Sequence, residues 1–212
     1  MLEINAESEN YHRPSNARPA QQTKRGVVFL DRDGVIVADL GYISDPGRLE
    51  MISGAASAIR ALQQQFRVIV VTNQSGIARG MFTEDNLVAI HRALINDLAT
   101  QGAIVDGFYF CPHLPGAPVT YYDRICDCRK PGPGMLIRAE TDWNIDLKQS
   151  YMVGDRASDM EAAAAAGVTG IIITDNDEDG SVATMKAKDL TEATVLIIAD
   201  AEFKSADISK QQ

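Results

Sequence analysis

Short apolar runs recur along the chain, and each one stops abruptly at polar residues. They are VVFLD (27–31), VIVVT (68–72), IVDGFYF (104–110), YMVGD (151–155) and VTGIIIT (168–174). Consecutive apolar positions, as opposed to alternating ones, are typical of strands that are buried on both faces of a parallel sheet. The pattern therefore predicts five such strands.

Segments with apolar residues at helical spacing separate these runs. The predicted helices cover 53–65, 83–102, 133–143 and 157–167. Ser53 and Thr83 stand at expected N-cap positions, and Pro133 lies near a first helical position. Gly167 is suited to end the last helix. The tail from residue 175 is compatible with a helix or a strand. Strands that alternate with helices predict an α/β fold, a Rossmann-like parallel sheet with helices on both faces.

The first 24 residues differ from the rest of the chain. They are polar, contain two prolines and show no hydrophobic period. This composition predicts a poorly ordered polar arm over residues 1–24, with a docked extension as the alternative. Residues 25–212 are expected to form one domain, because a chain of this length suits a single core.

Composition restricts the classes of partner. The formal net charge of −9 argues against nucleic acid and anionic membranes as partners. No apolar run approaches the roughly 20 residues that span a bilayer, and the N-terminus does not resemble a signal peptide. Three cysteines cannot all pair within one chain, so a reducing compartment, the cytoplasm, is expected.

Acidic residues follow two of the predicted strands. Asp31 and Asp33 come directly after the first strand, and Asp155 ends the fourth, with Asp159 on the helix that follows. Ligands of open parallel sheets bind beyond the carboxyl ends of the strands. Carboxylates that face each other there repel unless a cation separates them, and hard oxygen ligands suit Mg²⁺. The sequence therefore predicts a magnesium site at this edge.

Phosphate-binding groups are expected at the same edge. The segment VTNQSG (71–76) offers a hydroxyl and a turn with free backbone N–H groups, and Lys130 offers a positive charge. Each feature has an ordinary reading: D-x-D-G and T-N-Q-S-G are also turn sequences, and most lysines lie on the surface. Their convergence on one sheet edge favours a phosphate site.

All three cysteines lie in one loop, residues 111–128. Cys111-x-His113 and Cys126-x-Cys128 form two closely spaced pairs with the ligand types of a tetrahedral zinc site. Four protein ligands leave no open position, so the zinc is expected to be structural. The alternative is three unrelated thiols and a loop histidine. Because Arg129 follows at once, a zinc-stapled loop would fix the direction of this cation.

The segments FLDRDGVI, VTNQSGI, CRKP and VGDRASD, in this order, resemble the haloacid dehalogenase superfamily of phosphohydrolases over about residues 27–174. The resemblance implies that Asp31 is the nucleophile and a Mg²⁺ ligand. It implies that Asp33 is the general acid and base and offers its backbone carbonyl to the metal. Asp155 would complete the metal shell, supported by Asp159. Val35 stands where members often have threonine.

The same resemblance gives the phosphoryl group its partners, Thr72 and Lys130. C-P-H, the C-x-C-R-K-P segment and a D-x-G-Y stretch narrow the resemblance to the D-glycero-D-manno-heptose-1,7-bisphosphate 7-phosphatase family, to which histidinol-phosphate phosphatases are related. The substrate-binding residues that it implies are Asp39, Leu40, Gly41, Tyr42, Thr72, Asn73, Gln74, Ser75, Arg129, Lys130 and Arg156. No insertion is long enough for a large cap domain, and a monomer is expected.

The resemblance implies a Mg²⁺-dependent phosphomonoesterase of carbohydrate metabolism and heptose biosynthesis. It would remove the 7-phosphate of D-glycero-D-manno-heptose 1,7-bisphosphate, a small sugar phosphate, through an aspartyl-phosphate. Histidinol phosphate or another small phosphomonoester is the alternative substrate. A catalytically silent phosphate-binding interaction module is the alternative from another class. The intact pair of Asp31 and Asp33 argues against that module, because binding alone needs no nucleophile.

Overall fold

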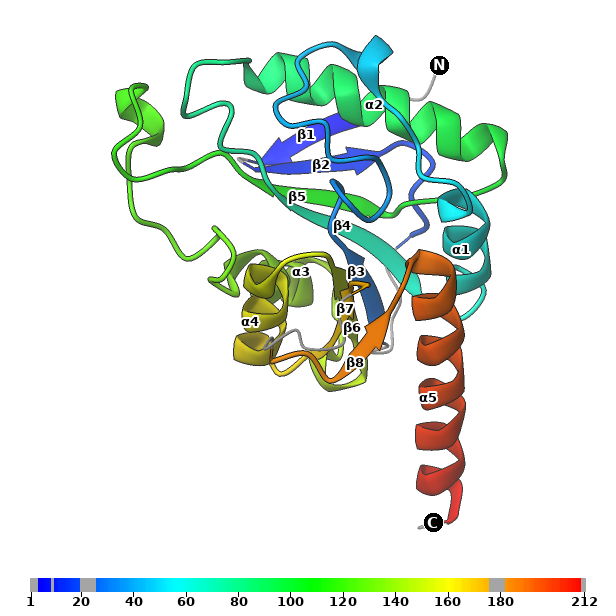
Figure 1. Cartoon of the computed structure of the whole chain (residues 1–212). Helices are drawn as coiled ribbons and strands as arrows, with labels where there is room; N and C mark the ends of the chain where they lie inside the picture. The colour runs from blue at the N-terminus through cyan, green and yellow to red at the C-terminus, as the bar shows by residue number, and fades with distance from the viewer. Residues whose placement is uncertain (1–3, 9, 20–25, 176–181, 211–212) are drawn as a thin grey trace.

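The computed structural model describes residues 4–8, 10–19, 26–175 and 182–210. The five predicted strands are present and run parallel in the order β5-β4-β3-β6-β7, at the centre of an eight-stranded sheet (Figure 1). They are β3 (Val27–Leu30), β4 (Arg67–Asn73), β5 (Gly107–Cys111), β6 (Tyr151–Gly154) and β7 (Thr169–Ile173). The strand expected from residue 104 begins at Gly107.

Helices cover both faces of the sheet, as predicted. They are α1 (Ala55–Leu62), α2 (Glu84–Thr100), α3 (Gly134–Trp143), α4 (Ala157–Ala166) and α5 (Leu190–Lys210). Val28 and Leu30 of β3 share a core with apolar residues of α1, α2 and α5. Val27 and Phe29 point to the other face, into a core formed with α3 and α4. This alternation explains why the strands are apolar throughout.

The N-terminal segment is docked where the structure describes it. Strands β1 (Ile4–Ser8) and β2 (Tyr11–Pro14) extend the sheet antiparallel beyond β5, so the sheet is mixed and not wholly parallel. Tyr11 stacks on Tyr109 with ring centroids 4.5 Å apart, and His12 is buried. For residues 4–8 and 10–19, the structure therefore agrees with the alternative prediction of a docked extension and not with a poorly ordered arm. Residues 1–3, 9 and 20–24 of the expected arm lie outside the described residues.

Most of the expected helix ends are present. Thr83 caps α2, with Asn86 completing a capping box, and Gly167 ends α4 in the left-handed conformation. The expected cap at Ser53 is wrong: α1 begins after Gly54, whose φ of 86° supplies the turn without a side-chain hydrogen bond.

The tail contains both kinds of element, strand β8 (Met185–Ala187) at the sheet edge and then α5. Short 3₁₀ helices η1 (Pro46–Arg48), η2 (Thr120–Tyr122) and η3 (Leu147–Gln149) lie in the connections. None of the helices in the described part of the chain combines the length and apolarity needed to cross a bilayer.

Candidate active site

Three adjacent strands end at one edge of the sheet, and predicted site residues follow each of them. β3 lies between β4 and β6, so Asp31, Thr72 and Asp155 come together at the carboxyl ends of the strands. Gly34 has a φ of 79°, and a Cβ on it would collide with the Asp155 carboxylate. The turn after β3 therefore needs glycine for two reasons, its backbone conformation and the close approach of Asp155.

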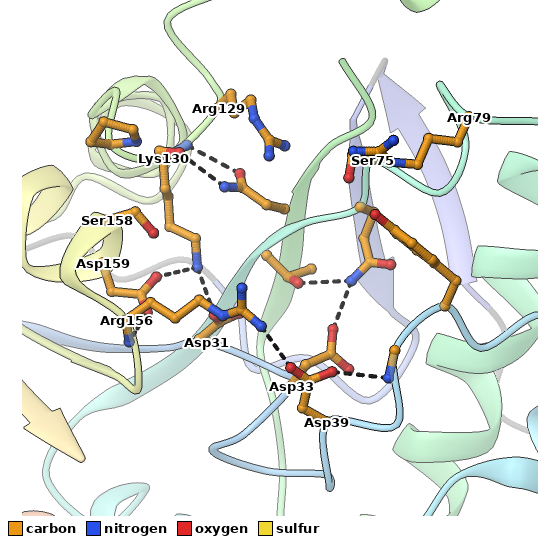
Figure 2. Close-up of a pocket in the computed structure, with 16 residues that line it drawn as sticks. Asp31, Asp33, Asp39, Ser75, Arg79, Arg129, Lys130, Arg156, Ser158 and Asp159 are labelled. Atoms are coloured by element: carbon orange, nitrogen blue, oxygen red, sulfur yellow. Dashed lines mark hydrogen bonds and ion pairs between the residues drawn. The ribbon is translucent and has the colours of Figure 1, made fainter. Parts of the chain in front are cut away.

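Lys130 is buried among the acids, with 3% of its surface exposed. Its Nζ lies 3.0 Å from Asp31 Oδ2 and 2.6 Å from Asp159 Oδ1, and it donates to the Val71 carbonyl at 2.9 Å (Figure 2). Burial alone would lower the pKa of Lys130, but the two carboxylates outweigh it and raise the pKa. The ammonium is thus fixed as a cation beside Asp31.

The carboxylates at this edge carry more negative charge than the nearby cations neutralise. Burial raises the pKa of Asp31, although Lys130 opposes the shift. Burial, followed by the charges of Asp31 and Asp159, raises the pKa of Asp155 to about 6. One buried oxygen of Asp155, Oδ1, accepts no hydrogen bond. Carboxylate oxygens of Asp31, Asp155 and Asp159 lie within 4.8 Å of one another. This donor set fits a hard divalent cation.

Asp33 has different neighbours from Asp31. Its Oδ1 accepts from Arg32 Nε at 3.0 Å and from Arg32 Nη2 at 2.8 Å. Its Oδ2 accepts from Arg32 Nη2 at 2.7 Å and from Gln74 Nε2 at 3.0 Å. The same Gln74 amide donates to Thr72 Oγ1 at 2.9 Å. Gln74 was predicted as a substrate contact, and the structure places it between Asp33 and Thr72.

Asn73 joins the end of β4 to the loop that carries Lys130. Its Nδ2 donates to the Lys130 carbonyl at 3.0 Å, and its Oδ1 accepts from the Lys130 backbone N–H at 3.1 Å. Asn73 lines the predicted site, and its side-chain amide is engaged with backbone. The position of the ammonium therefore depends on Asn73 as well as on the acids.

A cavity of about 580 Å³ lies above these groups. It is lined by Asp31, Asp33, Asp39, Gly41, Tyr42, Thr72, Asn73, Gln74, Ser75, Arg79, Arg129, Lys130, Pro131, Arg156, Ser158 and Asp159. Of the residues predicted for catalysis, magnesium or substrate, Leu40 and Asp155 are outside this lining. Arg79 and Ser158 were missed by the sequence analysis, although both lie within a few residues of predicted positions.

Cations lie around the cavity. Arg156 Nη2 pairs with Asp39 Oδ2 at 2.6 Å, and Arg79 lies over the Tyr42 ring at 5.8 Å from its centroid. Figure 2 shows Arg156 on the side of Asp31 and Arg79 on the side of Ser75, with Arg129 above Lys130. The cavity has room and positive charge for an anion larger than inorganic phosphate.

The cysteine loop gathers its four predicted ligands. The three Sγ atoms lie 3.3 to 3.6 Å apart, and His113 Nδ1 is 3.3 Å from Cys128 Sγ and 3.6 Å from Cys111 Sγ. Zinc–sulfur bonds of about 2.3 Å place tetrahedral sulfur ligands about 3.8 Å apart, close to this arrangement. The cluster fits a structural zinc ion.

Sequence comparisons match the chain to phosphatases. Residues 127–200 match the family model described as HAD-hyrolase-like. The D-glycero-beta-D-manno-heptose-1,7-bisphosphate 7-phosphatase of Yersinia pestis is 46% identical over 142 residues, 66% of this chain and 76% of its own. The protein of the same name from Salmonella typhi is 42% identical over 186 residues, 87% of this chain and 96% of its own.

A solved structure supports the same relationship. The D,D-heptose 1,7-bisphosphate phosphatase from B. bronchiseptica, complexed with magnesium and phosphate, superposes with a TM-score of 0.70 at 31% identity. The alignment covers 82% of this chain and 99% of the other. The likeness therefore extends over the whole of that enzyme.

Proposed function

Because the chain belongs to the D-glycero-beta-D-manno-heptose-1,7-bisphosphate 7-phosphatase family, we propose that it is a Mg²⁺-dependent phosphatase that removes the 7-phosphate of that sugar bisphosphate. One observation carries the proposal. Asp31 lies 3.0 Å from the buried ammonium of Lys130, at the floor of a cavity of about 580 Å³. A carboxylate can attack an anionic phosphate only where positive charge offsets their repulsion.

The reaction has two steps at phosphorus. In the first, an Asp31 oxygen bonds to phosphorus, the ester P–O bond breaks, and Asp33 gives its proton to the departing sugar oxygen. In the second, Asp33 takes a proton from water, and the water oxygen bonds to phosphorus. The bond from phosphorus to Asp31 then breaks, which releases inorganic phosphate and restores the carboxylate. Lys130 and Thr72 hold phosphoryl oxygens in both steps.

Asp31, Asp155 and the backbone carbonyl of Asp33 would hold the magnesium ion, with Asp159 in support. When bound, Mg²⁺ supplies positive charge that offsets the repulsion between these acids and the phosphoryl oxygens. Asp155 Oδ1 accepts no hydrogen bond, and its ion pair with Arg156 Nε is long at 4.0 Å, which supports this assignment.

The substrate assignment depends on the outer part of the cavity. Arg129 and Arg156 are positioned for the phosphate that does not react, and guanidinium binds phosphate through two donors. Asp39, Leu40, Gly41, Tyr42 and Ser75 are proposed to surround the sugar. Zinc on the cysteine loop would hold Arg129 and Lys130 in place. We place the enzyme in the cytoplasm as a monomer that binds neither nucleic acid nor membrane, with residues 25–212 as its phosphatase domain.

Phosphate release by the purified protein tests the function. The zinc-loaded protein with Mg²⁺ is assayed on D-glycero-D-manno-heptose 1,7-bisphosphate and on histidinol phosphate, and ³¹P NMR identifies which phosphate leaves. Selective loss of the 7-phosphate, absent in Asp31→Asn, is the expected result. Preference for histidinol phosphate would retain the chemistry and overturn the substrate. Release that persists in Asp31→Asn would overturn the mechanism.

A further inference from the structure

Arg32 stands between the two catalytic acids, yet its side chain points into the protein. It is 1% exposed, and its backbone N–H donates to Asp31 Oδ1 at 2.7 Å. Among the described residues its guanidinium forms an ion pair with one carboxylate, that of Asp33. Buried ion pairs add little net stability, so the main effect of this pair is to fix the direction of the Asp33 carboxylate.

The contacts define that direction from two sides. Nε and Nη2 of Arg32 hold both oxygens of Asp33 at 2.7 to 3.0 Å, and Gln74 holds Oδ2 at 3.0 Å. The Asp33 side chain nevertheless keeps 20% of its surface exposed, and it lines the cavity. A substrate oxygen can approach this exposed part of the carboxylate, and one of the four hydrogen bonds must be released when Asp33 carries the proton.

Among the described residues, Asp33 is the charged group that pairs with the Arg32 guanidinium. Burial, then the nearby charges of His12 and Arg32, lowers the pKa of His91 well below its usual value, so this neighbour is neutral. Nη1 of Arg32 is buried and has no hydrogen-bond partner. The guanidinium thus directs its remaining donors, Nε and Nη2, to one residue, Asp33.

We propose that Arg32 is a positioning residue for proton transfer, which orients Asp33 toward the oxygen of the departing alcohol. The proposal rests on the function proposed above. It predicts that loss of Arg32 slows substrates whose leaving group needs a proton, and spares those whose leaving group does not. A residue that only stabilised the fold would affect both kinds of substrate alike.

The test compares phosphoenzyme formation from two substrates by rapid quench. For Arg32→Met, the rate with the heptose bisphosphate should fall by about 100-fold, the lower range for general acid catalysis. The burst of p-nitrophenolate from p-nitrophenyl phosphate, whose leaving group departs without a proton, should change by less than about 5-fold. Arg32→Lys should recover part of the loss, because lysine restores the charge without the paired donors.

Two further variants separate positioning from folding. Arg67→Met is the matched control, because Arg67 is also buried and paired with a carboxylate, Asp106, but lies outside the cavity. It should lower the unfolding midpoint without changing the ratio of the two rates. The double variant Arg32→Met with Asp33→Asn should be no slower than Asp33→Asn alone, since both act on one proton.

Equal losses on both substrates, or an additive double variant, would overturn the proposal. If the wild type does not hydrolyse the heptose bisphosphate, the proposed substrate is wrong. The same comparison of leaving groups can then be made with histidinol phosphate or glycerol phosphate. A selective loss with these alkyl phosphates still supports positioning by Arg32. If Arg32→Met does not fold, Arg32→Lys carries the same test, both alone and combined with Asp33→Asn.

Discussion

The two edges of the sheet both bury charge, but they balance it differently. The carboxyl-edge cluster contains Asp31, Lys130, Asp155 and Asp159. The amino-edge cluster contains Arg18, Arg67 and Asp106. At the first edge, three carboxylates face one buried ammonium, and the exposed Arg156 approaches Asp155 only to 4.0 Å. At the second edge, one carboxylate faces two guanidinium groups.

The two clusters also differ in the number of hydrogen bonds that their carboxylate oxygens accept. Asp106 is fully buried, and both its oxygens accept, from Arg18, from Arg67 and from the Val68 backbone N–H. At the carboxyl edge, Asp155 Oδ1 accepts no hydrogen bond, and the pKa of Asp155 is raised to about 6. A satisfied cluster stabilises the fold, whereas excess charge with open ligand atoms indicates a site that awaits a ligand.

Asp31→Asn should have the largest effect on function and little on stability. A carboxamide does not attack phosphorus, so kcat should fall by at least about 10,000-fold. Removing one charge from a cluster of repelling acids should leave the unfolding midpoint equal or higher. Phosphate release, and thermal unfolding measured in EDTA, check the two parts. Residual turnover near that of the wild type would refute the nucleophile assignment.

Asp106→Asn should show the opposite pattern. It leaves Arg18 and Arg67 without a charge partner, which should lower the free energy of unfolding by about 3–5 kcal/mol. The kcat of the folded fraction should stay within about 2-fold of the wild type, because Asp106 does not line the cavity. Urea unfolding and steady-state kinetics give the two quantities. A selective loss of kcat would show that the edges are not independent.

Cys126→Ser should affect stability first and chemistry second. The variant should lose its zinc, measured by metal analysis, and its unfolding midpoint should fall by about 5 °C or more. KM should rise more than kcat falls, because Arg129 loses its anchor whereas Asn73 still holds the backbone of Lys130. Unchanged zinc content would show that the proposed zinc site is wrong.

Asp155→Asn should have the smallest effect on stability, which is measured without metal because Asp155 is a proposed Mg²⁺ ligand and its loss should also impair turnover. The raised pKa means that the folded wild type loses stability as pH rises from about 4 through about 6, where Asp155 gives up its proton. The variant should therefore gain about 1 kcal/mol over the wild type above pH 6, after allowance for partial exposure. Urea unfolding in EDTA across this range measures the gain. A difference that does not vary with pH would contradict it.

Local patterns explain what the sequence could predict. The acids and Lys130 lie next to apolar strands, so their place at the carboxyl edge follows from the strand order expected for an α/β fold. The four zinc ligands share one loop and are equally local. Their roles remain predictions until the variants above are measured.

Long-range pairing explains what the sequence could not predict. Strand β2 is four residues long and reads Tyr-His-Arg-Pro, which has no apolar period. Its burial depends on partners far along the chain: Tyr109, and His91, whose Nδ1 lies 2.9 Å from that of His12. The inward direction of Arg32 is likewise invisible in a D-R-D-G motif, because packing against distant segments decides it.

The double hydrogen bond between Asn73 and the backbone of Lys130 has a consequence for protein engineering. Lys130 is held by β4 and by the neighbouring cysteine cluster, and both anchors lie outside residues 114–125. Exposed positions such as Tyr121 and Ile125 can therefore be redesigned without displacing the ammonium. This stretch contributes no residue to the lining of the cavity, so changes there should leave the reaction centre intact.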